Sequence, residues 1–256
     1  MRIGILGGTG PAGRALAARL ASVGFDVVVG SRSKYRAMEV VDTLLEHWPD
    51  RRLTIGAAEN AGAADTDVVV IATPWDGATQ TAVSVEDQLR GKVVVSMANA
   101  LVKLGKEFQP LVPPRGSVAA SVQAAVPQCM VAAAFHHVPA KELGDLREPI
   151  ESDVLICSDH AQAVEVTSEI VAKIPNMRPL NAGELAMATP IESFTAVLLQ
   201  LNLHYKTRVA LKLTGIPAGA VPMVASAPAE GADGARASKG KPNGSAERPA
   251  ATEPTA

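Results

Sequence analysis

The 256-residue sequence predicts an α/β fold built on a doubly wound parallel sheet. Three observations favour this fold class. Short apolar runs, typical of buried parallel strands, alternate with helical segments through the first part of the chain. The first run leads into spaced glycines between residues 8 and 13, which open a helix. A second apolar run follows that helix and completes a βαβ unit.

Each expected element has a local signal of its own. Pro11 at the first helical position and Gly24 behind the last apolar residue delimit the first helix, and Pro49 ends the second. Runs of apolar and β-branched residues indicate the strands between them. Strands are expected at 3–6, 25–29, 53–55, 68–72 and 93–96, and helices at 11–23, 33–48, 57–64 and 76–90.

The alternation becomes less regular after Ser96. Pro113-Pro114 indicate a loop, and a helix of small residues is expected to end at Pro127. An apolar segment over 184–213 is predicted to be mostly helical and bent or broken around Pro190. The other elements expected in this half are helices at 117–126 and 160–173 and strands at 130–135, 154–157 and 177–181.

This pattern divides the chain into three parts. Residues 1–181 are expected to form the sheet domain, and residues 182–216 a small helical C-terminal subdomain that closes over the cleft. Residues 217–256 consist mainly of Ala, Gly, Pro and Ser with scattered charge and contain no aromatic residue. Such a segment cannot bury enough apolar area to offset its ordering entropy, so we expect a disordered C-terminal tail.

Composition and charge exclude several classes of protein. A formal net charge of −2 gives no bulk attraction to nucleic acid. Cys129 and Cys157 are the only cysteines, which excludes a cysteine-rich zinc site and gives no sign of a disulfide framework. No apolar run is long enough to span a bilayer, and no basic and apolar leader precedes the first strand. We therefore expect a cytoplasmic protein that binds neither membranes nor nucleic acid.

The glycine-rich turn indicates a dinucleotide site. Gly8 permits a tight turn after the first strand, Gly10 allows the backbone to approach a diphosphate, and Gly13 allows the helix to pack closely. The N-terminus of the following helix offers free N–H groups and a partial positive charge to an anion. The glycines are also compatible with a simple turn, but their place between a strand and a helix favours the dinucleotide.

The end of the second strand predicts which dinucleotide is bound. Enzymes that select NAD usually carry an acidic residue there, which accepts hydrogen bonds from the ribose 2′-hydroxyl. Ser31 and Arg32 stand in its place, with Lys34 and Arg36 close behind. A guanidinium binds phosphate through two parallel hydrogen bonds, so these residues favour the 2′-phosphate of NADP. The alternative is an ordinary polar loop.

Further polar segments follow the later strands. Thr73-Pro74-Trp75 and residues 96–99 come at carboxyl ends of strands, where ligands of open α/β sheets bind. Pro74 would give the nicotinamide a rigid wall, although both segments are also compatible with ordinary turns. His136 and His137 are expected on an extended segment with their side chains on opposite faces, so at most one faces a cleft. From chemistry alone that histidine is either structural or part of the cleft, and no metal site is expected.

Several familiar catalytic motifs are absent from the sequence. It contains no Gly-x-Ser-x-Gly nucleophile pattern, no phosphate-loop Gly-Lys-Ser and no Tyr-x-x-x-Lys dehydrogenase motif. The hydride acceptor is therefore expected to need little acid–base help, as when the acceptor is itself a redox cofactor.

The sequence resembles the F420-dependent NADP oxidoreductases, a family of NADPH-dependent reductases of the deazaflavin coenzyme F420. The resemblance extends in order, and with the family's spacing, through nearly all of residues 1–216, whereas residues 217–256 lie outside it. It rests on Leu6-Gly-Gly-Thr-Gly-Pro-Ala-Gly13, Val29-Gly-Ser-Arg32, Thr73-Pro-Trp75, Ala134-Phe-His-His-Val-Pro-Ala140, Val154-Leu-Ile-Cys-Ser-Asp159 and Glu192-Ser-Phe-Thr195.

The resemblance implies a Rossmann domain with a small helical C-terminal part, a homodimer, and direct, reversible hydride transfer between nicotinamide C4 and deazaflavin C5. It implies that His136 and Ala140 lie where the two rings stack, with His136 as a positioning group or a proton partner for the reduced ring. The chain departs from the family at Leu185-Ala186-Met187, where Leu-Ser-Asn is frequent. If this loop helps to shape the deazaflavin pocket, the departure changes the affinity for the acceptor. The resemblance also assigns Thr9, Gly10, Pro11 and Ala12 to the diphosphate, Ser31, Arg32 and Arg36 to the 2′-phosphate, and Pro74 to the nicotinamide half.

The sequence therefore predicts an NADP(H):F420 oxidoreductase whose partners are small-molecule coenzymes. Two alternatives stay open. One is an NADP-dependent reductase of a small imine, keto acid or metal chelate, since related folds host such chemistry. The other is a protein that binds NADP(H) without catalysis and signals through its tail.

Overall fold

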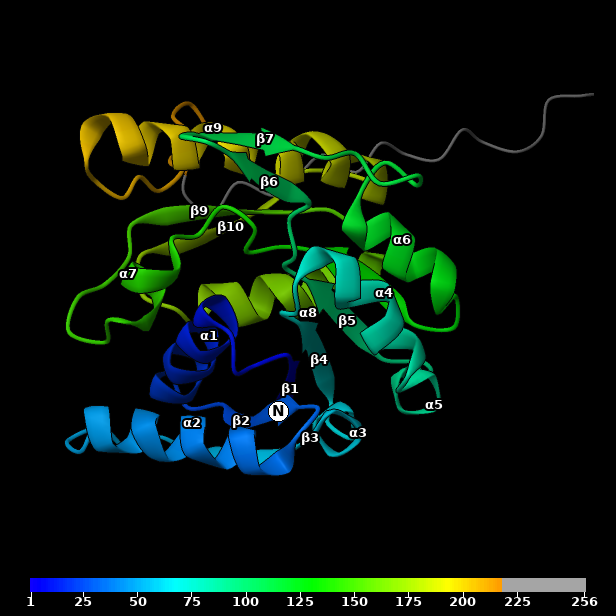
Figure 1. The fold of residues 1–256 in the computed structure, drawn as a ribbon, viewed down its shortest axis with the longest axis vertical. Helices are drawn as coiled ribbons and strands as arrows, with labels where there is room; N and C mark the ends of the chain where they lie inside the picture. The colour runs from blue at the N-terminus through cyan, green and yellow to red at the C-terminus, as the bar shows by residue number, and fades with distance from the viewer. Residues whose placement is uncertain (218–256) are drawn as a thin grey trace, which may run out of the picture. The chain divides into compact units, whose positions relative to one another are not determined.

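Six parallel strands form the central sheet of the computed structural model, which describes residues 1–217 (Figure 1). The order β3-β2-β1-β4-β5-β8 reverses the direction of winding between β1 and β4. It is the order of doubly wound dinucleotide-binding sheets and confirms the predicted fold class. Apart from residue 217, the tail expected over 217–256 lies outside the described residues. The strands are β1 (Arg2–Leu6), β2 (Asp26–Ser31), β3 (Ile55–Glu59), β4 (Val68–Ile71), β5 (Val93–Ser96) and β8 (Met130–Ala133).

Helices cover both faces of the sheet, which explains why its strands are apolar throughout. Alternate residues of β1 serve opposite layers: Ile3 and Ile5 pack into one core cluster and Leu6 into the other. The first layer contains α1 (Pro11–Ser22), α2 (Lys34–His47) and α8 (Ala161–Ala172). The second contains α3 (Asn60–Ala64), α4 (Trp75–Val83), α5 (Glu86–Leu89) and α6 (Val118–Ala125).

Two expected boundaries in the first half of the chain are wrong. The third strand begins at Ile55, where the sequence predicts its end, and α3 consequently begins at Asn60 rather than at residue 57. Ala57 and Ala58 favour helices intrinsically, but both pair with β2, so strand pairing overrides their propensity.

The single helix expected at 76–90 is in fact two helices, α4 and α5. Val85 leaves helical geometry between them, with φ −132° and ψ 25°. Its side chain is buried in the second core cluster. The break therefore coincides with an apolar anchor that the core holds in place.

Two elements go beyond the sequence prediction. An antiparallel hairpin of β6 (Leu101–Leu104) and β7 (Glu107–Pro110) turns at Gly105, whose φ is 61°. The hairpin lies along α9 (Ala188–Tyr205) (Figure 1). The other element, α7 (Ala140–Gly144), packs against α1. Such short segments carry too little periodicity to be recognised in the sequence.

Strands β9 (Ser152–Ile156) and β10 (Met177–Asn181) form a separate parallel pair. Cys157, directly after β9, forms an antiparallel bridge with Ala133 at the end of β8. Strand β9 therefore approaches the main sheet from beyond its carboxyl edge. This places the β9–β10 pair next to the edge where ligands of such folds bind.

Helix α9 is continuous across Pro190, contrary to the expected bend. Pro190 is the third residue of the helix, where its missing N–H has no helical acceptor to lose. A 3-10 turn at Leu185–Met187 precedes the helix, and residues 206–217 after it are not helical. The helical extent expected over 184–213 is therefore too long. No helix within residues 1–217 is long and apolar enough to cross a membrane.

An ion pair ties the chain after α9 to the β9–β10 pair. Arg178 of β10 donates to both carboxylate oxygens of Asp153, at 2.8 and 2.6 Å. The same guanidinium donates to the carbonyls of Leu213 and Ile216 at 2.7 and 2.6 Å. Asp153 in turn accepts the Leu213 N–H at 2.6 Å. The end of the described chain is thus held by charge-assisted hydrogen bonds.

The close approach of α3 to the sheet can be tested by a substitution at Gly4 of β1. A Cβ at this position would lie 1.7 Å from the carbonyl oxygen of Ala63 and 2.8 Å from the Thr66 hydroxyl. We expect Gly4→Ala to lower the free energy of unfolding by about 3 kcal/mol, because α3 must move away from β1. Urea unfolding followed by circular dichroism measures the change.

Gly77 in α4 provides the matched control, since a Cβ there meets no atom within 4 Å. We expect Gly77→Ala to be neutral or to stabilise the protein by up to about 1 kcal/mol. Equal losses in the two variants would contradict the close approach of α3.

Candidate functional site

Four of the predicted ligand-binding segments lie at one edge of the molecule. The glycine turn follows β1, Ser31 ends β2 and is followed by Arg32, Thr73-Pro74 comes after β4, and residues 96–99 begin at the last residue of β5. Because these strands are parallel and adjacent, their carboxyl ends share one edge of the sheet. Strand β8 also ends at this edge, and the loop that carries His136 begins there.

The glycine turn is built by backbone contacts that leave no room for side chains. Gly7 adopts φ +71°, a left-handed conformation that the motif alone does not predict at this position. The Gly8 N–H donates to the carbonyls of Ile5 and Gly30 at 3.1 and 3.0 Å, which joins β1 to β2. A Cβ on Gly13 would lie 2.8 Å from the Cα of Gly8, so the first turn of α1 packs directly on the glycine turn.

Gly10 differs from these glycines. A Cβ on Gly10 would meet nothing closer than the Gly7 oxygen at 3.6 Å, so the protein itself leaves space here. Gly10 is also the N-cap of α1, and no side chain caps its amides. Since Pro11 has no N–H and Arg14 donates to Gly10, the amides of Ala12 and Gly13 have no helical partner. An uncapped helix start with open backbone suits a diphosphate.

The end of β2 has an excess of cationic side chains. Arg32, Lys34 and Arg36 are exposed, and within residues 1–217 none of the three takes part in an ion pair. The Ser31 hydroxyl is buried and accepts the Ser33 N–H at 3.3 Å. Glu59 ends the neighbouring strand β3 as the register partner of Ser31, but β2 itself ends without a carboxylate. This set of donors fits a phosphate better than a ribose hydroxyl.

Several buried polar atoms at this edge have no hydrogen-bond partner among the described residues. They are the Thr73 hydroxyl after β4, the Ser96 hydroxyl at the end of β5, and both ring nitrogens of His136 after β8. Buried polar groups are normally paired, so unpaired groups on three neighbouring strands call for an explanation. Pro74 stands beside them as the N-cap of α4 and has no N–H to donate.

The two histidines do not lie on an extended segment, so that expectation is wrong. β8 ends at Ala133, and Phe135 adopts φ 64° and closes a turn in which Val138 donates to its carbonyl at 3.2 Å. This turn buries both rings. The His137 ring donates through Nε2 to the Asp153 carbonyl at 2.8 Å.

The His136 side chain is completely enclosed, and it lies beside a buried carboxylate. Burial and the neighbouring His137 lower the pKa of His136 to about 3, so its ring is neutral at neutral pH. Its Nε2 lies 3.9 Å from a carboxylate oxygen of Glu192 in α9. Burial raises the pKa of Glu192 to about 7, against the opposing effect of two backbone hydrogen bonds.

Glu192 of α9 contacts helix α6 as well as the loop that carries His136. Its two carboxylate oxygens accept the N–H groups of Val118 and Ala119, at 2.8 and 3.1 Å, in the first turn of α6. A carboxylate at this end of a helix also matches the helix dipole. Glu192 was not among the predicted site residues.

Thr195, one turn after Glu192, completes the contact of α9 with this loop. Its hydroxyl lies within hydrogen-bond distance of the His136 carbonyl and of Asn99 Oδ1, at 3.3 and 3.2 Å. Asn99 donates to the same His136 carbonyl at 3.0 Å. The available signal was a Glu and a Thr three residues apart on a largely apolar helix, which puts both on one face.

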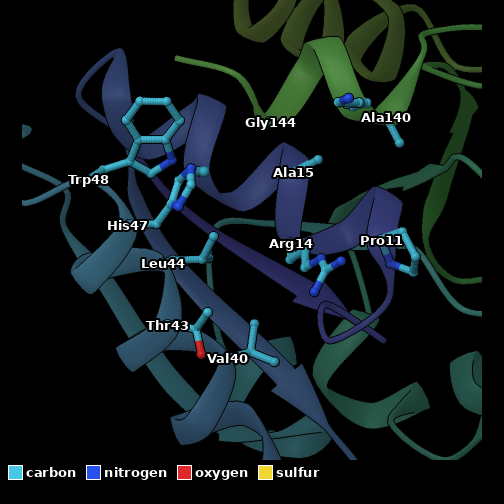
Figure 2. Close-up of a pocket in the computed structure, with 12 residues that line it drawn as sticks. Pro11, Arg14, Ala15, Val40, Thr43, Leu44, His47, Trp48, Ala140 and Gly144 are labelled. Carbon is cyan, nitrogen blue, oxygen red and sulfur yellow. The ribbon is translucent and has the colours of Figure 1, made fainter. Parts of the chain in front are cut away.

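Ala140 opens α7 and lies close to the start of α1. With Pro11 it lines a pocket of about 580 Å³ between α1, α2 and α7 (Figure 2). The structure thus brings Ala140 near the glycine turn, whereas His136 is enclosed on the side of α9 and α6.

The strand order, the open glycine turn and the unpaired cations define a dinucleotide-binding protein of the Rossmann type. A family model for coenzyme F420-dependent NADP oxidoreductases matches residues 2–100. The F420-dependent NADP reductase of Methanocaldococcus jannaschii is 33% identical over 222 residues, which cover 84% of this chain and 99% of that protein. The F420-dependent NADP reductase of Methanothermobacter thermautotrophicus is also 33% identical, over 85% of this chain and 96% of its own.

The chain belongs to the family of F420-dependent NADP reductases. A crystal structure described as a putative F420-dependent NADP reductase from Arthrobacter sp. FB24 supports the fold. It has a TM-score of 0.70 at 22% identity and covers 83% of this chain and 100% of its own.

The pKa of Glu192 predicts how stability depends on pH. Because this pKa is raised from 4.5 to about 7 on folding, the carboxyl stabilises the fold fully below pH 4.5 and loses that contribution as the pH rises through 7. In Glu192→Gln the group no longer titrates. Between pH 4.5 and 8 we expect the free energy of unfolding of Glu192→Gln to rise, relative to wild type, by on the order of 3 kcal/mol.

Urea unfolding at a series of pH values tests this dependence. His136 also makes stability depend on pH in this range, because its pKa is lowered to about 3 in the folded protein while the unfolded chain still binds a proton. This contribution is common to both proteins and cancels in the comparison. Glu46→Gln on the exposed face of α2 is the control and should follow wild type. Parallel curves for Glu192→Gln and wild type would show that Glu192 ionises as in the unfolded chain.

Proposed function

We propose that the chain catalyses reversible hydride transfer between NADP(H) and coenzyme F420. The observation that carries this proposal is the 33% identity over 99% of the Methanocaldococcus jannaschii reductase. The match covers 84% of this chain, so it extends beyond the strands that bind the nucleotide. The open glycine turn and the cationic end of β2 support NADP(H) as one of the two substrates.

The nucleotide half of the site uses donors that are already in place. The uncapped start of α1 would hold the diphosphate, and the Ser31 hydroxyl with the Arg32 and Arg36 guanidinium groups would hold the 2′-phosphate. Pro74 would form a rigid wall beside the nicotinamide. The residues proposed to bind NADP(H) are Gly8, Thr9, Gly10, Pro11, Ala12, Gly13, Ser31, Arg32, Arg36 and Pro74.

The acceptor half holds its groups by buried contacts. Both rings supply the redox chemistry when bound, so the protein has to hold them in near-attack geometry and exclude water. Ala140 is proposed to lie where the rings stack. We propose His136 as a positioning residue, because its carbonyl is held by Asn99 and Thr195 and its ring is enclosed beside Glu192.

We also propose the organisation that the family implies. Residues 1–181 would form the nucleotide-binding domain and residues 182–216 a helical subdomain, with a tail over 217–256. The protein would act as a cytoplasmic homodimer without nucleic acid or membrane partners. Exposed apolar side chains on α9, namely Phe194, Val197 and Leu203, support a subunit contact.

A spectroscopic assay tests the proposed reaction. When the protein is mixed with NADPH and oxidised F420, the deazaflavin absorbance should fall as the coenzyme is reduced, and it should rise again with reduced F420 and NADP⁺. Tight NADPH binding without any loss of absorbance would favour a sensor or a reductase of another acceptor. Small imines, keto acids and metal chelates tested with NADPH then separate those two alternatives.

Arg32 tests the preference for NADP. We expect Arg32→Ala to raise the KM for NADPH about 30-fold and that for NADH less than about twofold, because only NADPH loses a charge-assisted phosphate contact. Steady-state kinetics with both nucleotides measures the ratio. Arg52→Ala, which removes an exposed guanidinium after α2, is the control and should change neither KM. Equal effects on both nucleotides would overturn the 2′-phosphate assignment.

A further inference from the structure

We propose that the pocket between α1, α2 and α7 is a separate ligand site for a small organic anion with an apolar body. This inference goes beyond the proposed hydride transfer and does not depend on it. The pocket has a volume of about 580 Å³, within the range of roughly 300–1,000 Å³ that is usual for small-molecule sites.

The walls of the pocket are largely apolar. Figure 2 shows Val40, Leu44 and Trp48 along the α2 side, and Ala15 lines the pocket from α1. The rings of His47 and Trp48 meet edge to face, with their centroids 4.8 Å apart, and form an aromatic end wall. Such walls suit a planar or aliphatic ligand body, which gains free energy by leaving water.

The charged groups that line the pocket favour an anion. Arg14 on α1 and Lys141 on α7 are cations, and His47 adds a ring N–H, whereas the Thr43 hydroxyl already donates to the Glu39 carbonyl at 2.8 Å. None of the residues that line the pocket is Asp or Glu. Neither Arg14 nor Lys141 takes part in an ion pair within residues 1–217. Two cations without a neutralising carboxylate complement a carboxylate, sulfonate or phosphate group.

The position of the pocket separates it from the 2′-phosphate site. Its α2 residues Thr43 and His47 lie seven and eleven positions after Arg36. At a rise of 1.5 Å per residue, they are roughly 10 to 16 Å further along the helix. The pocket therefore extends away from the carboxyl edge, between the helices of the first layer. Only its near end, at Pro11 and Ala140, adjoins the proposed coenzyme residues.

Two fluorescent probes of similar size and different charge test the proposal with the full chain. The first is the anionic 8-anilinonaphthalene-1-sulfonate, and the second is the neutral N-phenyl-1-naphthylamine. We expect Arg14→Gln and Lys141→Gln each to raise the Kd of the anionic probe about fivefold to tenfold and that of the neutral probe less than twofold. Lys173→Gln, which removes an exposed cation after α8, is the control and should change neither Kd.

A second variant tests the cavity itself. Thr43 is an exposed pocket residue on α2, so Thr43→Trp should fill the pocket and leave the fold intact. We expect this variant to lose the tight binding of both probes. Binding of the anionic probe at saturating NADP⁺ and at saturating F420 should equal that of the free protein. Displacement by either coenzyme would overturn the proposal, because the pocket would then belong to the coenzyme site. Unchanged binding in all pocket variants would overturn it as well, because the probe would then occupy another apolar surface.

Discussion

At several glycines in and beside β1 the backbone packs too closely for any side chain, and this constraint determines how the glycine turn and its neighbours are arranged. Gly4 lies against the carbonyl of Ala63 in α3, and Gly13 in α1 lies against Gly8. The Gly8 N–H also reaches the carbonyl of Gly30 in β2. The helices α1 and α3 and the strand β2 thus all contact the same few backbone atoms of β1 and the glycine turn. The open amides of α1 and the cationic end of β2 consequently lie at a fixed separation from each other.

The other half of the site depends on side chains. Glu192 connects α9 to α6, and Thr195 and Asn99 hold the loop that carries His136. Burial disfavours the charged form of both ionisable groups, since it lowers the pKa of His136 and raises that of Glu192. The loop that carries His136 and the helices α6 and α9 are therefore held together by hydrogen bonds in the protein interior.

Most of the sheet could be predicted from the sequence because its signals are local. Buried parallel strands are uninterrupted apolar runs, and Pro11 and Gly24 mark the ends of α1 in the sequence. The start of β3 and the hairpin β6–β7 could not be predicted in this way. Ala57 and Ala58 become strand residues only through their pairing with β2, and the hairpin depends on its contact with α9.

The candidate site likewise contains parts that could be predicted from local sequence and parts that could not. The glycine turn and Ser31-Arg32 were predictable, since their spacing reflects contacts within one βαβ unit. The burial of His136 and its contact with Glu192 were not, because they require a loop, α6 and α9 to meet across more than fifty residues of sequence. A positive φ at Phe135, which redirects the loop, has no signal in the residue type.

The different construction of the two halves has an evolutionary consequence. The glycine contacts around β1 tolerate almost no substitution at Gly4, Gly8 and Gly13, since a carbon added there would displace a helix or a neighbouring backbone segment. A wall built from the side chains of α9, α6 and two loops changes its shape whenever a side chain is replaced, while the sheet beneath it stays as it is. Lineages that share this scaffold can therefore keep one coenzyme and exchange the molecule that reacts with it.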